Sequence, residues 1–278
     1  GREGPIVQIG SSMGSTFGQL LSLSTPRLRI CVGCGAAAGV AATFNAPIAG
    51  AFFAAEVILG GFSAAAFGPV VISSVSATVI SRSILGDIPA FEIPSYAIVS
   101  PAEMIPYTVL GLLAAVAAVT FVKVLHASEE AFERLKVLPD FLQPVIGGLG
   151  VGAIALGFPQ IMGTGYDTIE GALRAELGLG VLLAVLGTKL LATSLTLGSG
   201  GSGGVFAPSL FMGASLGGAV GMLADKTMPF EVASPGAYAV VGMGAVVAAT
   251  THAPITAILI IFELTGDYRV ITALMVSC

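Results

Sequence analysis

The chain begins with a short charged sequence, Gly1-Arg2-Glu3-Gly4-Pro5, that leads directly into an uncharged apolar segment. Proline is tolerated in the first turn of a helix, where its missing N–H has no intrahelical partner in any case. Glycine lets a backbone approach a ligand closely. A helix that starts here directs its unpaired N–H groups and its positive dipole end toward the surroundings of Glu3. The residue types therefore predict an anion-binding site that contains its own carboxylate.

A second segment of this kind lies in the other half of the chain, where Gly203-Gly204-Val205-Phe206-Ala207-Pro208 opens another apolar stretch. When Gly1 is aligned with Gly204, Pro5 coincides with Pro208. Glycines that follow also coincide: Gly10, Gly14 and Gly18 align with Gly213, Gly217 and Gly221. Glycine at this spacing favours close packing between membrane helices.

A further pair of segments repeats in the same order. AATFNAPIAGAFFAAEV from Ala41 aligns without gaps with AATTHAPITAILIIFEL from Ala248. Both pairs of similar segments occur in the same order, and the members of each pair are separated by nearly the same number of residues. This regularity indicates an internal duplication. Glu56 and Glu263 occupy equivalent positions in it, and we interpret both as structural carboxylates that accept hydrogen bonds from N–H groups of a neighbouring loop.

The composition indicates an integral membrane protein that crosses the bilayer several times. Hydrophobic residues make up 55% of the chain and charged residues 10%, whereas about a quarter of a typical soluble domain is charged. Many apolar segments are shorter than the roughly 20 residues that a spanning helix needs. One break is expected at Asn45-Ala46-Pro47. Short, broken segments in corresponding positions of two halves indicate the binding site of a transporter.

Other kinds of chemistry have weaker support. Gly200-Gly201-Ser202-Gly203-Gly204 satisfies the G-x-S-x-G pattern, but a nucleophile elbow needs a preceding strand and a His–acid pair. An intramembrane hydrolase is therefore only the alternative from a different class. Cys31 and Cys34 have no nearby histidine and are interpreted as inert thiols, so we expect no metal and no cofactor. Lys189 is expected to extend to the membrane surface or to pair with a carboxylate.

Three motifs resemble those of one membrane protein family. GREGP at Gly1–Pro5, AATFNAPIAG from Ala41 and GGVFAP at Gly203–Pro208 are similar to the signature motifs of the CLC chloride channels and chloride/proton exchangers. The resemblance covers essentially the whole chain. It implies an all-α integral membrane fold with two inverted-topology repeats of tilted and broken helices. It also implies a homodimer in lipid with one chloride pathway per subunit, and it implies no nucleic-acid partner and no covalent catalysis.

The resemblance also assigns roles to residues. Glu3 falls on the family's gating glutamate, whose carboxylate occupies an anion site and leaves it when protonated. The implied anion ligands are mainly backbone N–H groups, those of Val205 and Phe206 at the central site and those of Arg2, Glu3, Gly4, Phe206 and Ala207 at the outer site. The family's serine and tyrosine ligands have no match in this chain.

One position departs from the proton-coupled members of the family. These often carry a second glutamate directly after the position of Glu56, and this chain has Val57 there. The pair Glu56-Val57 resembles the passive channels, which favours a chloride channel gated by voltage or pH. A chloride/proton antiporter, with a proton path near Glu56, is the alternative.

The domain organisation expected from the resemblance is a single membrane domain. It consists of the second part of the first repeat (residues 1–85), a polar connection (86–101) and the second repeat (102–278). We expect the domain to continue beyond both ends, because the chain starts inside a motif and stops inside an apolar run. The apolar helices are expected at Pro5–Leu23, Ile30–Phe44, Ile48–Leu59, Pro69–Leu85, Glu103–Lys136, Phe141–Leu156, Leu177–Leu197, Val205–Leu223, Ala237–Ala249, Pro254–Thr265 and Val270–Cys278.

Overall fold

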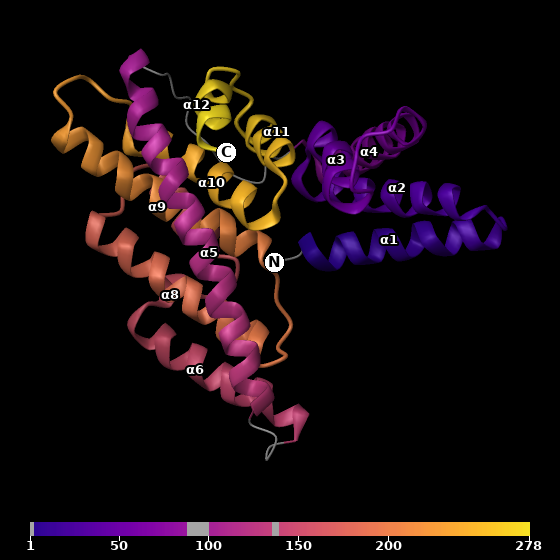
Figure 1. The fold of residues 1–278 in the computed structure, drawn as a ribbon, viewed down its shortest axis with the longest axis horizontal. Helices are drawn as coiled ribbons and strands as arrows, with labels where there is room; N and C mark the ends of the chain where they lie inside the picture. The colour runs from indigo at the N-terminus through magenta and orange to yellow at the C-terminus, as the bar shows by residue number, and fades with distance from the viewer. Residues whose placement is uncertain (1–2, 88–99, 135–138) are drawn as a thin grey trace.

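The computed structural model describes residues 3–87, 100–134 and 139–278, and the regular structure in these ranges is helical (Figure 1). The α-helices are α1 (Glu3–Leu20), α2 (Thr25–Phe44), α3 (Pro47–Phe53), α4 (Ala64–Leu85), α5 (Met104–Arg134), α6 (Gln143–Gly157), α7 (Tyr166–Leu173), α8 (Leu179–Gly198), α9 (Phe206–Thr227), α10 (Pro235–Thr251), α11 (Pro254–Thr265) and α12 (Val270–Ser277). A π-helical turn, Ala54–Ile58, continues α3, and short 3-10 turns precede α5, α6 and α7 at Pro101–Glu103, Asp140–Leu142 and Pro159–Ile161.

Several helices of the described part are long and apolar enough to cross a membrane. These spans are Thr25–Phe44, Ala64–Leu85, Pro101–Arg134, Leu179–Gly198 and Phe206–Thr227. Shorter apolar helices at Pro47–Ile58, Gln143–Gly157, Pro235–Thr251 and Pro254–Thr265 accompany them. Helix α9 is the most buried of these spans, with 83% of its most apolar part inside the protein, and it packs against α5, α8 and α10. The chain is therefore a multi-pass integral membrane protein, as the composition predicts.

The helices form two groups that meet at the start of α1. Figure 1 shows the indigo and purple helices α1 to α4 together on one side and α5 to α12 on the other, with the N-terminus between them. Helix α3 packs against α11, and the start of α1 reaches α9. The interior of the larger group contains fully buried side chains from α9 and α10, among them Leu210, Phe211, Tyr238 and Met243. This arrangement brings the first residues of the chain to α9.

Glycines allow two helix pairs to approach with their backbones in contact. A Cβ added at Gly10 of α1 would collide with the backbone of Gly35 on α2, and a Cβ at Gly217 of α9 would collide with the carbonyl of Tyr238 on α10. The predicted packing role of the repeated glycines is confirmed. The pairs α1–α2 and α9–α10 therefore have the same construction.

The predicted helix breaks occur at equivalent points of these two pairs. Asn45 caps the C-terminus of α2 and His252 that of α10, and both residues have left-handed backbones, with φ of 58° and 53°. The next helix starts two residues later, at Pro47 in α3 and at Pro254 in α11. The observed bounds of α11 equal the predicted ones. The structural similarity of these segments agrees with the internal duplication.

Other predicted bounds are wrong by a few residues. Helix α1 is described from Glu3, not from Pro5, and α9 begins at Phe206, with Val205 as the flanking residue. Helix α2 begins at Thr25, five residues before Ile30, because Pro26 occupies its first turn and the basic residues after it are helical. Gly1, Arg2, Lys136 and most of the connection 86–101 lie outside the described residues.

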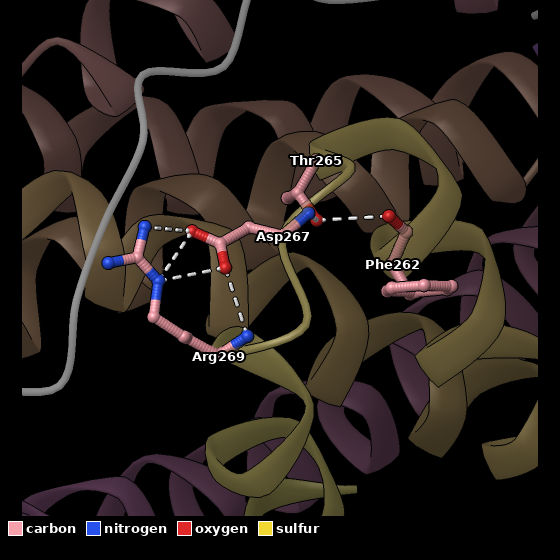
Figure 2. Close-up of polar contacts among 4 residues, drawn as sticks. All are labelled: Phe262, Thr265, Asp267 and Arg269. Carbon is pink, nitrogen blue, oxygen red and sulfur yellow. Dashed lines mark hydrogen bonds and ion pairs between the residues drawn. The ribbon is translucent and has the colours of Figure 1, made fainter.

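The connection between α11 and α12 is a turn fixed by its own side chains (Figure 2). The Thr265 hydroxyl donates to the carbonyl of Phe262 at 3.1 Å. The Arg269 guanidinium donates to both carboxylate oxygens of Asp267, at 2.8 to 3.2 Å. These hydrogen bonds from the Arg269 side chain hold the pKa of the Asp267 carboxyl below its usual range. The turn remains charged and closed at neutral pH.

Candidate functional site

Glu3 lies at the start of α1 and its side chain is directed into the protein. The residue is 5% exposed. Its Oε1 accepts a hydrogen bond from the Tyr166 hydroxyl of α7 at 3.1 Å. Gly4 and Pro5, which follow Glu3 in the first turn, are exposed. The predicted gating glutamate is thus a buried carboxylate with a hydroxyl donor from a distant part of the chain.

The start of α9 is the second predicted anion-binding element. Phe206 and Ala207 are its first helical residues, so their N–H groups have no intrahelical acceptor. Val205 precedes them and is 38% exposed, whereas Ala207 and Pro208 are buried. The Phe206 ring packs against Phe44 at the end of α2, with 5.3 Å between the ring centroids. This aromatic contact fixes the start of α9 against the α1–α2 pair.

The two helix starts line one cavity of about 1250 Å³. Ile6 of α1 belongs to its wall, and so do Gly203, Gly204 and Pro208 from the start of α9. Tyr166 contributes to the same wall. Since the N-terminus of a helix carries a partial positive charge, two such ends at one cavity favour a negative occupant. The structure therefore brings together the two segments that the sequence singled out.

The predicted surroundings of the Lys189 side chain are wrong. Its side chain neither reaches the membrane surface nor pairs with a carboxylate: the residue is 3% exposed, and Nζ donates to the carbonyls of Ile161 and Gly163 at 2.8 Å each. Nζ also lies 5.0 Å from the ring centroid of Phe211. A buried ammonium group needs several acceptors to offset its desolvation, and the loop before α7 supplies two of them. Lys189 therefore fastens that loop to α8.

Sequence reasoning missed Tyr166 as a partner of Glu3. The two residues are 163 positions apart, and a tyrosine after Gly165 has no spacing that marks it as a ligand. The only local signal is the sequence Gly163-Thr164-Gly165, which predicts a turn before a helix. In the structure both glycines of this turn have positive φ, 59° and 77°.

The repeated glutamates accept backbone hydrogen bonds, as the sequence predicts, but the donors lie in the first turns of two helices and not in a loop. Glu263 of α11 accepts from the N–H groups of Ile48 and Ala49 at 2.9 and 2.6 Å. Glu56 accepts from Thr256, through its N–H at 2.8 Å and its hydroxyl at 2.7 Å, with a longer bond of 3.4 Å from the N–H of Ile255. Each carboxylate thus caps the start of a helix in the other half of the chain.

The described residues offer no alternative site for a metal. Within 3–87, 100–134 and 139–278, no three His, Cys, Asp or Glu side chains come together in a way that could hold a metal ion. Cys31, Cys34 and Cys278 are free thiols. The cavity is the candidate site because both helix starts that the sequence singled out line it.

Fold and site together define a class: a multi-pass, all-helical membrane protein with broken helices, in which the starts of α1 and α9 line a common, anion-favouring cavity. Residues 1–278 match the protein family described as "Voltage gated chloride channel". The chain belongs to this family. The resemblance drawn from the three motifs is thus confirmed over the whole length of the chain.

A curated relative with a similar sequence is also named as a chloride channel protein. A curated protein of Ralstonia nicotianae named "Putative chloride channel protein ClcB-like" is 41% identical over 282 residues, which cover 100% of this chain and 66% of that protein. The chain thus spans less than two thirds of the length of this relative.

Solved structures confirm the predicted fold. The crystal structure of a slow cyanobacterial Cl⁻/H⁺ antiporter has a TM-score of 0.82 and 30% identity, covering 100% of this chain and 66% of that one. The crystal structure of a CLC-type fluoride/proton antiporter has a TM-score of 0.83 over 100% of this chain and 68% of that one. Its identity of 23% shows likeness of fold alone. The chain therefore has the all-helical CLC membrane fold.

Proposed function

We propose that this chain forms a chloride pathway through the membrane and that Glu3 is its gate. The observation that carries the proposal is the buried Glu3 carboxylate, whose hydrogen-bond partner Tyr166 lines the same cavity as Ile6 of α1 and the start of α9. Membership of the voltage gated chloride channel family supports chloride as the transported ion. The pathway acts in a lipid membrane, and we expect it to work in a homodimer.

The physical basis is binding by helix starts in place of fixed cations. Each helix N-terminus stabilises an adjacent anion by about 0.3–1 kcal/mol, and by up to about 2 kcal/mol when partly buried. The N–H groups of Val205, Phe206 and Ala207 add direct hydrogen bonds in this proposal. The sequence-based ligand set also includes the N–H groups of Glu3, Gly4 and Arg2, of which Arg2 lies outside the described residues. Ion passage needs binding that is favourable but weak enough for release. A carboxylate competes for such a site, and a protonated Glu3 does not.

Transport as a passive channel is the form that Val57 favours. Val57 follows Glu56 and is 41% exposed. Because its side chain is a valine, this position offers no carboxylate that could carry a proton. The alternative is chloride/proton exchange, the activity named for the cyanobacterial antiporter that is 30% identical to this chain. Reversal potentials of the reconstituted full-length protein under a pH gradient separate the two. A channel gives a potential set by chloride alone, and an exchanger gives one that shifts with pH.

Replacement of the Glu3 carboxylate tests the gate. In liposomes loaded with chloride, Glu3→Gln is expected to raise efflux at neutral pH and to abolish its dependence on external pH, because the amide carries no charge and does not compete with the anion. Glu231→Gln removes an exposed carboxylate from the connection between α9 and α10 and serves as the matched control. Glu3→Gln flux with unchanged rate and unchanged pH dependence would refute the gate.

A further inference from the structure

We propose that Tyr166 is a positioning residue for the Glu3 gate: its hydroxyl holds the carboxylate in the buried position, and Lys189 fixes the loop from which it does so. The inference rests on the proposed role of Glu3. It assigns a function to a segment, residues 161–166, that contains none of the motifs. The contact that carries it is the hydrogen bond of 3.1 Å from the Tyr166 hydroxyl to Oε1 of Glu3.

The loop before α7 is held at two points by one cation. Lys189 reaches from α8 to the carbonyls of Ile161 and Gly163, at 2.8 Å each. These carbonyls lie within five residues of Tyr166 on its N-terminal side. A buried ammonium group without acceptors costs several kcal/mol, so the cation and the loop conformation depend on each other. The loop is thereby fastened to a membrane-spanning helix.

The residue directly before Tyr166 packs tightly against helix α9. Gly165 has a φ of +77°, and a Cβ at this position would lie 2.5 Å from the Phe211 ring. Phe211 is fully buried in α9, and the same ring lies beneath Nζ of Lys189. The start of α7 therefore rests directly on α9. Tyr166 extends from this fixed start toward Glu3.

The hydroxyl and the ring of Tyr166 have separable roles. The ring is partly buried and packs against the main core cluster, and phenylalanine would fill the same space. Tyr166 lines the cavity, and its hydroxyl donates to the Glu3 carboxylate. Hydrogen bonds to charged groups are roughly twice as strong as those between neutral groups. The bond stabilises the conformation in which the carboxylate is buried. Its removal favours departure of the Glu3 side chain from the anion site.

Tyr166→Phe tests this role in the reconstituted full-length protein. We expect chloride efflux at neutral pH to rise about three- to tenfold, because the blocked state loses one charge-assisted hydrogen bond. The matched control is Tyr238→Phe. Tyr238 is a buried tyrosine of α10 whose hydroxyl has no hydrogen-bond partner among the described residues, so the efflux is expected to stay within twofold of the parent.

The same substitution in a Glu3→Gln background separates a gate effect from a structural one. If Tyr166 acts through the Glu3 carboxylate, Tyr166→Phe changes efflux in the parent and leaves the Glu3→Gln protein unchanged. An equal change in both backgrounds, a decrease, or no change in the parent would overturn the inference while the Glu3 gate stands. If Glu3→Gln itself has no effect on efflux, the proposed function fails and the inference fails with it.

Discussion

A charged side chain inside a membrane helix does not need a carboxylate as its partner, as Lys189 demonstrates. Its ammonium group donates to the carbonyls of Ile161 and Gly163 and lies over the Phe211 ring. Glu3 could be singled out from the sequence as a candidate site residue at a helix start, because a glycine, an arginine and a proline lie next to it. The partners of Lys189 could not, because backbone carbonyls have no signature of residue type and the bonds connect positions 26 and 28 apart.

Removal of the Lys189 charge is therefore expected to destabilise the protein. Lys189→Met keeps most of the side-chain volume but leaves two carbonyls without a donor, which costs about 2–3 kcal/mol in the free energy of unfolding. Denaturant unfolding in detergent micelles measures the change. Lys226→Met, at the exposed C-terminal turn of α9, is the control and is expected to change stability by no more than about 0.5 kcal/mol. A loss for Lys189→Met as small as the control's would contradict this account.

The elements of this fold are marked more clearly by their interruptions than by their apolar lengths. The break between α2 and α3 could be predicted from Asn45-Ala46-Pro47, because proline cannot continue a helix and asparagine tolerates the left-handed conformation. The start of α2 could not, because Arg27 and Arg29 are typical of a loop at the membrane surface and are nevertheless helical. The π-helical turn at Ala54–Ile58 has no sequence signal either.

The backbone contact between α9 and α10 gives a prediction for helix packing. Gly217→Ala places a methyl group against the carbonyl of Tyr238, so the helices must separate, and we expect a loss of about 1–3 kcal/mol in the free energy of unfolding. Gly152→Ala on α6 is the matched control, because a Cβ at Gly152 meets nothing within 4 Å. Thermal unfolding in micelles compares the two. Equal midpoints would show that α9 and α10 adapt to the added methyl group without cost.

At the scale of the whole molecule, two reciprocal carboxylates hold the repeated halves together. Glu56, in the turn after α3, caps the start of α11, and Glu263 on α11 caps the start of α3. The duplication made this pairing of positions visible in the sequence. It did not reveal that the two helices cap each other, because that depends on how the halves face one another. The division into residues 1–85, 86–101 and 102–278 remains a prediction.

The two reciprocal caps are expected to contribute to the free energy of unfolding in a coupled way. Glu263→Gln and Glu56→Gln each replace a charged acceptor of backbone N–H groups by a neutral one, which costs about 1–2 kcal/mol in the free energy of unfolding. The double variant should cost less than the sum, because loss of one cap already loosens the contact between α3 and α11 that the other cap holds. Glu129→Gln, on the exposed face of α5, is the control in the same micelle unfolding assay. A double variant whose loss equals the sum would mean that each cap stabilises its helix start independently, and the idea of coupled caps would be wrong.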